Sequence, residues 1–425
     1  MVNLTGINRK VLQTRCRKGE VYMSTAKLFE PLTLRNGVVI KNRIYKGAMS
    51  EGMADKSHRP TRELIHAYKR WADGGTGLSI TGNVMVDRRY LGEPGNIVVE
   101  DDRDLLLLKN WAEAGKRNHS HIWMQINHPG KQSPKSVSRQ PVAPSAIPIS
   151  GSAGSAFNPP RAMTSEEVTD TVNRFVKTAV TAKKAGFTGV QIHGAHGYLV
   201  SQFLSSRDNK RNDDYGGSLA NRMRFLTEIY TGMRVALGDS FPISLKINST
   251  DFDDEGFSFD DSIAVIKKMD ELGIDHIEIS GGDYEKPKMM GNGEVYFLDY
   301  AEKISQAVTT AVGVTGGFRK KESMIHALND TDVSMIGIAR ALVLNPELPN
   351  QLKSETYKDI TIPRLTTKVK VLDKMIGGFI GIAYYEQQIR RLGHNKSPKV
   401  HRNAWGPLFD MAKIHGPYAF IKRRR

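Results

Sequence analysis

The chain has 425 residues, 39% of them hydrophobic, a formal net charge of +16 and one cysteine. This hydrophobic content is sufficient for a large core, and the single Cys16 excludes an intramolecular disulfide and favours a reducing compartment. No run of about 18 apolar residues offers a transmembrane helix, since the most apolar stretch, residues 375–385, is too short.

The positive charge is concentrated at the two ends of the chain. Residues 1–23 contain five Lys or Arg and one Glu, and residues 363–425 contain fourteen Lys or Arg and three acids, net charges of +4 and +11. Residues 24–362 carry only +1, which argues against nucleic-acid binding by the body of the protein. We expect a cytoplasmic protein. The basic N-terminus leaves organelle targeting, or a start at Met23, open.

From residue 40 onward, short apolar β-like runs alternate with helical patterns. The predicted strands are 43–49, 77–83, 121–126, 189–193, 243–248, 276–280, 312–316 and 333–337. The predicted helices between them are 61–71, 104–118, 166–185, 219–237, 260–272, 300–310 and 321–328. Apolar runs without alternation are typical of buried parallel strands.

Eight β/α units in this order predict an α/β fold, a closed (β/α)₈ TIM barrel rather than an open doubly wound sheet. No GxGxxG opens a helix after the first strand, which also disfavours a dinucleotide-binding open sheet. Thr164 and Glu167 form a predicted capping box at the start of helix 166–185. The long insertions 129–163 and 281–298 follow the third and sixth strands, where they are expected to frame a pocket.

We expect three parts: a basic segment at 1–23, the barrel at 24–353 and a basic C-terminal extension at 354–425. The extension contains a helical pattern at 368–392, and aromatic residues follow it, a composition unlike that of disordered tails. The sequence therefore predicts that the extension, to about residue 409, packs on the barrel or on a partner subunit. It leaves self-association open. The last four residues, all basic, are expected to be solvated.

The run QIHGAHGYL, residues 191–199, places two imidazoles and a phenol directly after a predicted strand. His193 and His196 are three residues apart, and Tyr198 is two further on. Carboxyl ends of the strands form the active-site face of a TIM barrel, so this run is a candidate site. Either His taken alone is equally well explained as a buried, hydrogen-bonded residue.

The following residues, 203–218 (FLSSRDNKRNDDYGGS) with Asn221 and Arg222, resemble the old yellow enzyme family of FMN-dependent ene-reductases. The bacterial-type and dienoyl-CoA-reductase-like branches are the most similar, and the resemblance covers about residues 28–350. It implies a barrel with FMN as cofactor, NADH or NADPH as co-substrate and an activated alkene as substrate. The chain has no iron–sulfur cysteine cluster and no second nucleotide-binding domain, so free nicotinamide would supply the electrons.

A phosphate site is indicated by the residues themselves. Glycines follow the seventh and eighth predicted strands, where barrels bind phosphate, and Arg340 can add a charge-assisted contact. Turn-forming glycines and a surface ion pair of Arg340 are the alternative explanation. The resemblance implies that Gly317, Gly337 and Arg340 hold the FMN phosphate.

Other positions are assigned by the resemblance and by their chemistry. Lys246 lies in the middle of a predicted buried strand, so it must face an anion, a carboxylate or a ligand. The family commonly has Arg there, directed at the pyrimidine edge of the flavin, and Gln125 is implied at the same edge. Ser50 is implied beside a flavin carbonyl, and Gly82 as a small residue behind the flavin.

The resemblance implies catalytic roles for the three residues of the first motif. His193 and His196 would hydrogen-bond the substrate oxygen and stabilise developing enolate charge, and Tyr198 would donate the proton. A tyrosine keeps its proton at neutral pH because its ordinary pKa is about 10.

Two other functions were weighed. A zinc hydrolase site at His193 and His196 would need further ligands at other strand ends, which carry Gln125, Lys246 and Ser50 instead, so no metal is expected. The second alternative is a non-catalytic or weakly active barrel whose basic extension binds an acidic partner such as lipid or RNA.

Overall fold

The computed structural model describes residues 24–151, 153–282, 285 and 295–416. The predictions for residues 1–23, for most of 281–298 and for the final basic residues therefore fall wholly or partly outside the described residues. Eight parallel strands form the centre of the molecule: β3 (Ile44–Lys46), β4 (Leu78–Ile80), β6 (His121–Asn127), β9 (Gly189–Gly194), β10 (Ile243–Asn248), β11 (His276–Ser280), β12 (Ala311–Thr315) and β13 (Met335–Ile338).

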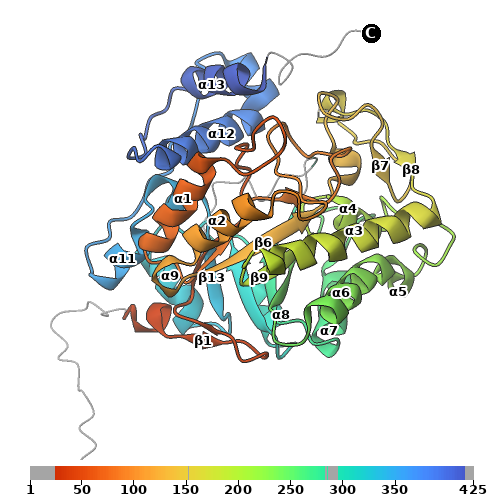
Figure 1. Cartoon of the computed structure of the whole chain (residues 1–425), viewed down its shortest axis with the longest axis horizontal. Helices are drawn as coiled ribbons and strands as arrows, with labels where there is room; N and C mark the ends of the chain where they lie inside the picture. The colour runs from red at the N-terminus through yellow and green to blue at the C-terminus, as the bar shows by residue number, and fades with distance from the viewer. Residues whose placement is uncertain (1–23, 152, 283–284, 286–294, 417–425) are drawn as a thin grey trace, which may run out of the picture.

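Each of these strands pairs in parallel with the next one in chain order, and β13 pairs with β3 to close the barrel (Figure 1). The (β/α)₈ barrel predicted from the sequence is confirmed. The first predicted strand, 43–49, was too long, because β3 ends at Lys46 and the chain then turns along the carboxyl end of the barrel.

Helices surround the barrel and follow the strands in order. They are α1 (Arg62–Asp73), α2 (Leu105–Gly115), α3 (Ser165–Lys184), α4 (Leu199–Leu204), α5 (Leu219–Arg222), α6 (Arg224–Leu237), α7 (Phe259–Glu271), α8 (Leu298–Ser305), α9 (Lys321–Asn329), α10 (Arg340–Leu344) and α11 (Leu348–Lys353). The predicted helix 219–237 is divided into α5 and α6 at Met223, and the predicted helix 300–310 ends five residues early.

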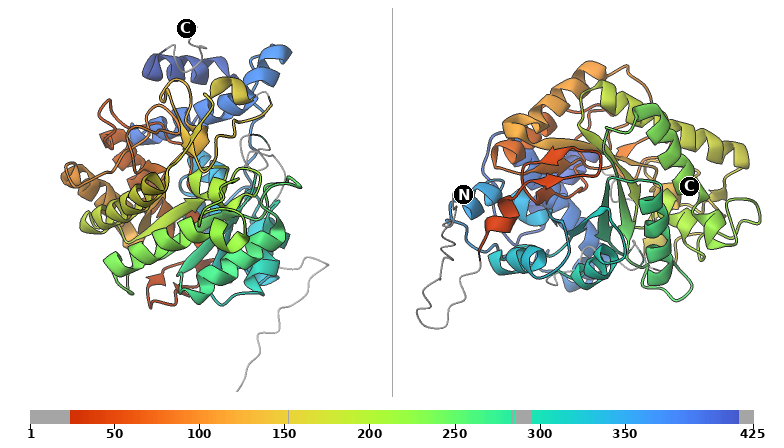
Figure 2. Two further views of the ribbon diagram at one scale, coloured as in Figure 1. Left: turned by 90° about the vertical axis from the view of Figure 1, so that its right-hand side faces the viewer. Right: turned by 90° about the horizontal axis from the view of Figure 1, so that it is seen from below.

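Shorter elements complete the barrel. A hairpin of β1 (Leu32–Thr33) and β2 (Val39–Ile40) lies at the end of the barrel opposite the C-terminal helices, and β5 (Val84–Met85) extends the sheet beside β6 (Figure 2). In the insertion after β6, β7 (Val142–Ala143) pairs with β8 (Arg161–Ala162). Single 3₁₀ turns occur at Ala26–Phe29, Arg117–His119, Gly130–Gln132 and Ala153–Ala156.

Strand side chains point alternately to two cores. The larger core lies between the sheet and the helices, and a smaller one fills the hairpin end of the barrel interior around Tyr45, Trp123 and Met335. The predicted capping box of α3 is present, with Glu167 N–H donating to Thr164 Oγ1 (3.2 Å) and Thr164 N–H to Glu167 Oε2 (3.0 Å).

The motif that carries the family resemblance builds the loop between α4 and α5. Asp208, almost fully buried, accepts from Lys131 Nζ (2.8 Å) and from Arg207 Nε (3.2 Å). The Asn209 amide donates to the carbonyls of Phe203 in α4 and Tyr215 in the loop, and Arg222 donates to the Leu204 carbonyl at the end of α4. These polar residues satisfy buried backbone groups beside the candidate site.

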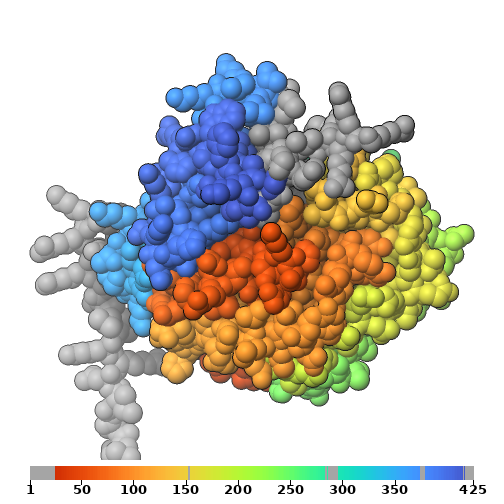
Figure 3. Space-filling model, turned by 45° about the horizontal axis from the view of Figure 1, so that its top comes forward, coloured from red at the N-terminus to blue at the C-terminus, as the bar shows by residue number. Residues whose placement is uncertain are grey.

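The C-terminal part forms α12 (Lys370–Gly393) and α13 (Trp405–His415), close to the predicted helix at 368–392. Helix α12 packs along α1 and against α10, and α13 packs on α12. At Gly393 a Cβ atom would lie 2.4 Å from the Glu63 carbonyl oxygen, so only glycine allows this approach to α1. Both helices lie together on the outside of the molecule, next to the residues of the first part of the chain (Figure 3). No helix in the described parts of the chain is long and apolar enough to cross a membrane.

Candidate active site

His193, His196 and Tyr198 gather at the carboxyl end of β9. The His193 ring lies 5.2 Å from the His196 ring and 4.8 Å from the Tyr198 ring, both edge-to-face. Strand register places His193 beside Lys246 of β10. His196 adopts a left-handed backbone (φ 61°), a conformation that costs energy for a non-glycine residue and occurs often at functional sites.

Hydrogen bonds define the state of the two imidazoles. His193 Nδ1 accepts from the Ala195 N–H (3.3 Å), so the proton of a neutral ring is on Nε2. His196 Nε2 lies 2.7 Å from Ser280 Oγ, and its backbone N–H donates to Asn248 Oδ1 (3.1 Å). Burial, and then the positive charge of Lys246, hold the pKa of both rings well below 6.5. Both imidazoles are therefore neutral at pH 7, and His193 is a hydrogen-bond donor at Nε2.

Lys246 faces a carboxylate, one of the alternatives that the sequence left open. Its Nζ lies 3.0 Å from Glu278 Oε1 on the neighbouring strand β11. On the other side, Glu278 Oε2 accepts from Gln191 Nε2 (2.8 Å), and Gln191 Oε1 accepts from Gln125 Nε2 (2.8 Å). One buried chain of polar groups thus joins Gln125 and Lys246, the two residues that the resemblance assigned to one edge of the flavin.

The residues directly after β3 are more exposed to solvent than the residues on either side of them. Ala48, Met49 and Ser50 are partly exposed, whereas residues 44–47 and 51–53 are buried. A Cβ atom at Gly82 would lie 2.7 Å from both the Met49 carbonyl oxygen and a carboxyl oxygen of Glu51. The protein's own packing therefore requires glycine at position 82, and a role behind the flavin stays a prediction.

The predicted phosphate residues lie at the ends of β12 and β13. Gly316 (φ 134°) and Gly317 (φ 84°) have backbones that favour glycine and are partly exposed. Arg340 begins α10. Burial lowers the pKa of Arg340, Tyr385 of α12 opposes this shift, and the positive charge of Arg319 adds a smaller lowering.

Gly337 has a different explanation in the structure. It lies inside β13, and a Cβ atom there would come within 2.0 Å of Thr315 Oγ1 and 2.5 Å of the Tyr45 ring. Its lack of a side chain makes room for the Tyr45–Thr315 pair in the barrel interior. The contact of Gly337 with a phosphate stays a prediction.

Sequence reasoning missed three residues of this region. Glu278 could have been found by the argument used for Lys246, because it is a charge in an apolar strand. Arg319 follows the paired glycines by two residues and carried no separate signal. Glu386 of α12 could not be identified from the sequence, because its position depends on how the C-terminal extension packs on the barrel.

Glu386 brings a carboxyl group from α12 to the barrel. A Cβ atom at Gly52 would lie 2.7 Å from its Oε1, and Arg390 Nη2 donates to the Gly52 carbonyl and to Glu386 Oε2, both at 3.3 Å. Burial raises the pKa of Glu386 and of Glu93, and repulsion between the carboxyl groups adds to the shift of Glu93. These carboxyls adjoin the Ser50 segment, since Ser50 is close enough to Glu93 to lower the pKa of that carboxyl.

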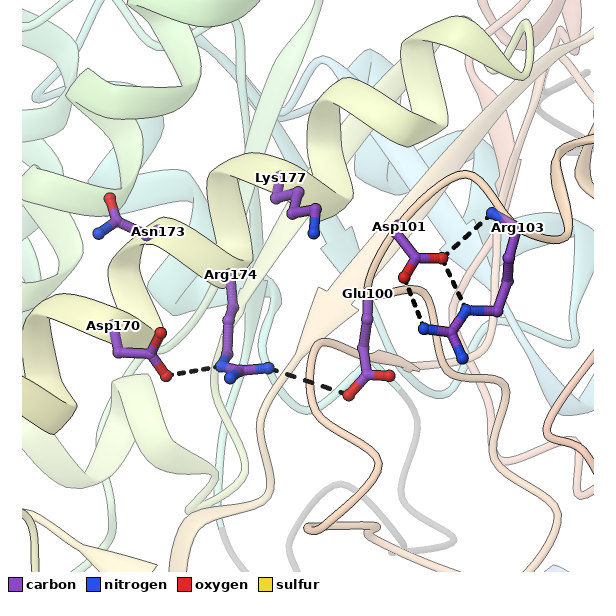
Figure 4. A pocket seen from close by; sticks show the side chains of 7 residues that line it. All are labelled: Glu100, Asp101, Arg103, Asp170, Asn173, Arg174 and Lys177. Atoms are coloured by element: carbon purple, nitrogen blue, oxygen red, sulfur yellow. Dashed lines mark hydrogen bonds and ion pairs between the residues drawn. The ribbon is translucent and has the colours of Figure 1, made fainter.

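A separate hollow of about 340 Å³ lies on the outside of the barrel, between α3 and the loop before α2 (Figure 4). Its charged side chains are largely paired with one another, as in Arg174–Asp170 (2.7 Å) and Arg103–Asp101 (2.6 Å). We interpret it as a surface ion-pair network. No group of three or more His, Cys, Asp or Glu side chains that could hold a metal ion occurs within residues 24–151, 153–282, 285 and 295–416.

The sequence profile of the NADH:flavin oxidoreductase / NADH oxidase family matches residues 27–359. The chain belongs to this family. The assignment to the old yellow enzyme family is confirmed, and with it an NAD(P)H-dependent flavin oxidoreductase that uses FMN. The residues present fit this cofactor, since the interior chain of polar groups offers hydrogen-bond partners at one site, and Gly316, Gly317 and Arg340 offer backbone groups and a cation at the ends of β12 and β13.

The names of individual relatives agree with this family assignment. The NADH-dependent flavin oxidoreductase iliE of Hypocrea jecorina is 36% identical over 349 residues, covering 75% of this chain and 87% of that protein. The NADPH dehydrogenase of a Geobacillus species is 33% identical, covering 76% and 92%. Among solved structures, a 2-naphthoyl-CoA reductase complex has a TM-score of 0.74 at 25% identity, covering 78% of this chain and 53% of that one.

Proposed function

We propose that the protein reduces the C=C bond of α,β-unsaturated carbonyl or related electrophilic compounds with NADH or NADPH, in a ping-pong reaction. The observation that carries this proposal is the cluster of His193, His196 and Tyr198 at one strand end, with His193 neutral and donating from Nε2. When bound, FMN would supply the hydride transfer from the nicotinamide to the alkene.

Seven residues of the barrel would hold the cofactor. Lys246 and Gln125, which share one buried hydrogen-bond chain, would bind the pyrimidine edge, and Ser50 a flavin carbonyl. Gly82 would adjoin the ring, while Gly317, Gly337 and Arg340 would contact the phosphate. Arg319 joins this proposal because it lies near Arg340.

The substrate would be bound and activated by the β9 motif. His193 Nε2 and His196 would donate hydrogen bonds to the carbonyl oxygen of the alkene, which withdraws electrons from the β-carbon and stabilises negative charge on the oxygen. As hydride reaches the β-carbon, the phenol of Tyr198 would give its proton to the α-carbon, so that the C=C bond gains one hydrogen at each end.

Helix α12 would belong to the same catalytic unit. The support is that Glu386 lies on Gly52 and that Arg390 bonds the Gly52 carbonyl, two residues from Ser50. We therefore keep the boundary between the barrel and the extension after residue 353, and we treat the extension as part of the catalytic unit. A basic extension that serves only to bind an acidic partner would not need these contacts.

Transient kinetics tests the proposed function. Oxidised enzyme mixed anaerobically with NADH or NADPH should lose its yellow flavin absorbance, and an added unsaturated ketone should restore it with formation of one saturated ketone per flavin. Rapid reduction by nicotinamide without any reoxidation by unsaturated ketones, aldehydes or nitroalkenes would contradict the alkene substrate while leaving the family assignment intact.

A further inference from the structure

Glu278 is an anion in the interior of the barrel. Along β11, His276, Glu278 and Ser280 point to one face while Ile277 and Ile279 point to the other. The Glu278 side chain is 0% exposed, and a buried carboxylate is costly unless it is paired and hydrogen-bonded. The partners of Glu278 explain how its carboxylate can be buried.

Each Glu278 oxygen has strong partners. Oε1 accepts from Lys246 Nζ (3.0 Å) and Thr315 Oγ1 (2.6 Å), and Oε2 accepts from Gln191 Nε2 (2.8 Å). Burial alone raises the pKa of Glu278, but Lys246 and these hydrogen bonds outweigh it and hold the pKa below 4.5. Glu278 is thus ionised and acts only as an acceptor.

An acceptor at this point fixes the direction of the whole chain. Gln191 must give its N–H groups to Glu278, so its Oε1 faces Gln125 and accepts from Nε2 at 2.8 Å. Thr315 must donate to Glu278, so it accepts from the Tyr45 hydroxyl (2.8 Å). The charge of Glu278 therefore decides which way the amide of Gln125 and the ammonium of Lys246 are presented.

We propose that Glu278 is a positioning residue of the flavin site, which orients Lys246 and Gln125 and offsets the positive charge that Lys246 presents to the cofactor. This inference rests on the proposed placement of FMN. Electron uptake makes a flavin more negative at its pyrimidine edge, and a lysine there favours it. A carboxylate 3.0 Å behind that lysine opposes it, in surroundings of low dielectric where charges interact strongly.

Substitution tests the contribution of each charge. Glu278→Gln keeps the shape, removes the charge and turns one acceptor oxygen into a donor. Lys246 then has no anionic partner at this position, which should make the flavin midpoint potential more positive. Lys246→Gln should make it more negative. The double variant is neutral at both positions, as the wild-type ion pair is overall, and its potential should lie between those of the single variants.

Midpoint potentials are measured on purified, FMN-loaded enzymes by anaerobic equilibration with a dye of known potential. Ser244→Ala is the control: Ser244 contacts Gln191 (3.2 Å) and His276 (2.9 Å) in the same interior but carries no charge, so the potential should stay that of the wild type. An unchanged or more negative potential in Glu278→Gln would overturn the inference, because a merely structural role does not set the sign of the shift.

If Glu278→Gln does not retain flavin, Lys246→Gln is compared with the double variant, which differs from it only at position 278. The double variant should have the more positive potential, and equal potentials would overturn the inference. Wild-type protein that fails to bind FMN would instead contradict the proposed cofactor site itself, so the two failures are distinguishable.

Discussion

Lys246 and Glu278 form an ion pair of 3.0 Å inside the barrel, with side chains 3% and 0% exposed. The pair explains how a buried strand can contain a lysine. The free-energy cost of removing each charge from water is offset by the opposite charge and by hydrogen bonds. Lys246 also lies beside His193 in the strand register, and burial together with the charge of Lys246 lowers the pKa of His193.

Replacing Arg340 should weaken FMN binding. A charge-assisted hydrogen bond contributes about 1.5–3 kcal/mol, so Arg340→Ala should raise the dissociation constant for FMN roughly 10- to 100-fold. Titration of flavin fluorescence measures this. Arg103→Ala, which removes an arginine from the surface hollow of Figure 4, is the matched control and should bind FMN as the wild type does.

Tyr198→Phe should separate the two half-reactions. Loss of a general acid slows the alkene step on the order of 10²–10⁴-fold, while reduction of the flavin by nicotinamide stays close to wild type. Stopped-flow absorbance follows each half-reaction separately. Equal losses in both would mean that Tyr198 positions the flavin or the nicotinamide instead of delivering a proton.

His193→Ala should weaken the binding of phenols, whose oxygen mimics the developing enolate. The neutral ring donates one hydrogen bond from Nε2, so the loss should be about 10-fold or more. Phenol binding is measured by the perturbation of the flavin spectrum. His119→Ala, an exposed histidine outside the site, is the control, and wild-type phenol affinity in His193→Ala would contradict the oxyanion role.

Glu386→Gln should stabilise the protein at high pH. Burial raises the pKa of Glu386 to about 7, above its ordinary 4.5, so the folded state favours the protonated form. Stability from this group is therefore present at pH 4–5 and lost as the pH rises through about 7. Because Gln resembles the protonated carboxyl, the melting temperature of the variant should match wild type near pH 5 and exceed it at pH 9. A constant difference across that range would contradict the shift.

The basic C-terminus can be tested without disturbing α13. Deleting residues 396–425 would remove Leu408 and Met411 and expose Ile380 and Ala383, which pack with them, so the informative truncation removes residues 417–425 only. If the cations of the tail attract anionic nicotinamide, the truncated enzyme should have a higher KM at low salt and a flatter dependence on salt. Identical kinetics at low and high salt would contradict a catalytic role of these residues.

The periodic parts of this molecule were predictable from the sequence. Eight apolar runs separated by helical patterns gave the barrel, and Thr164 with Glu167 gave a helix start, because these features depend on residues close together in the chain. The motif containing His193 and Tyr198 was likewise found, since consecutive residues after a strand share one end of a barrel.

Features that depend on neighbours distant in the sequence were not predictable. The packing of Gly337 on Tyr45 and Thr315 appears only when three strands are in register, while its predicted contact with a phosphate stays a prediction. In the same way, the carboxyl of Glu386 reaches Gly52 across more than 300 positions. The partner of Lys246 was left open for the same reason, because a strand pattern does not say which residue faces it.

The most direct test of the central claim is the oxidative half-reaction of wild-type enzyme. FMN-loaded protein is reduced anaerobically with one equivalent of NADH or NADPH and then mixed with 2-cyclohexenone, while flavin absorbance and product are followed. Flavin absorbance should return and one cyclohexanone should form per flavin, with this step slowed in Tyr198→Phe. Enzyme that stays reduced with every activated alkene, yet is reoxidised by oxygen, would contradict this claim.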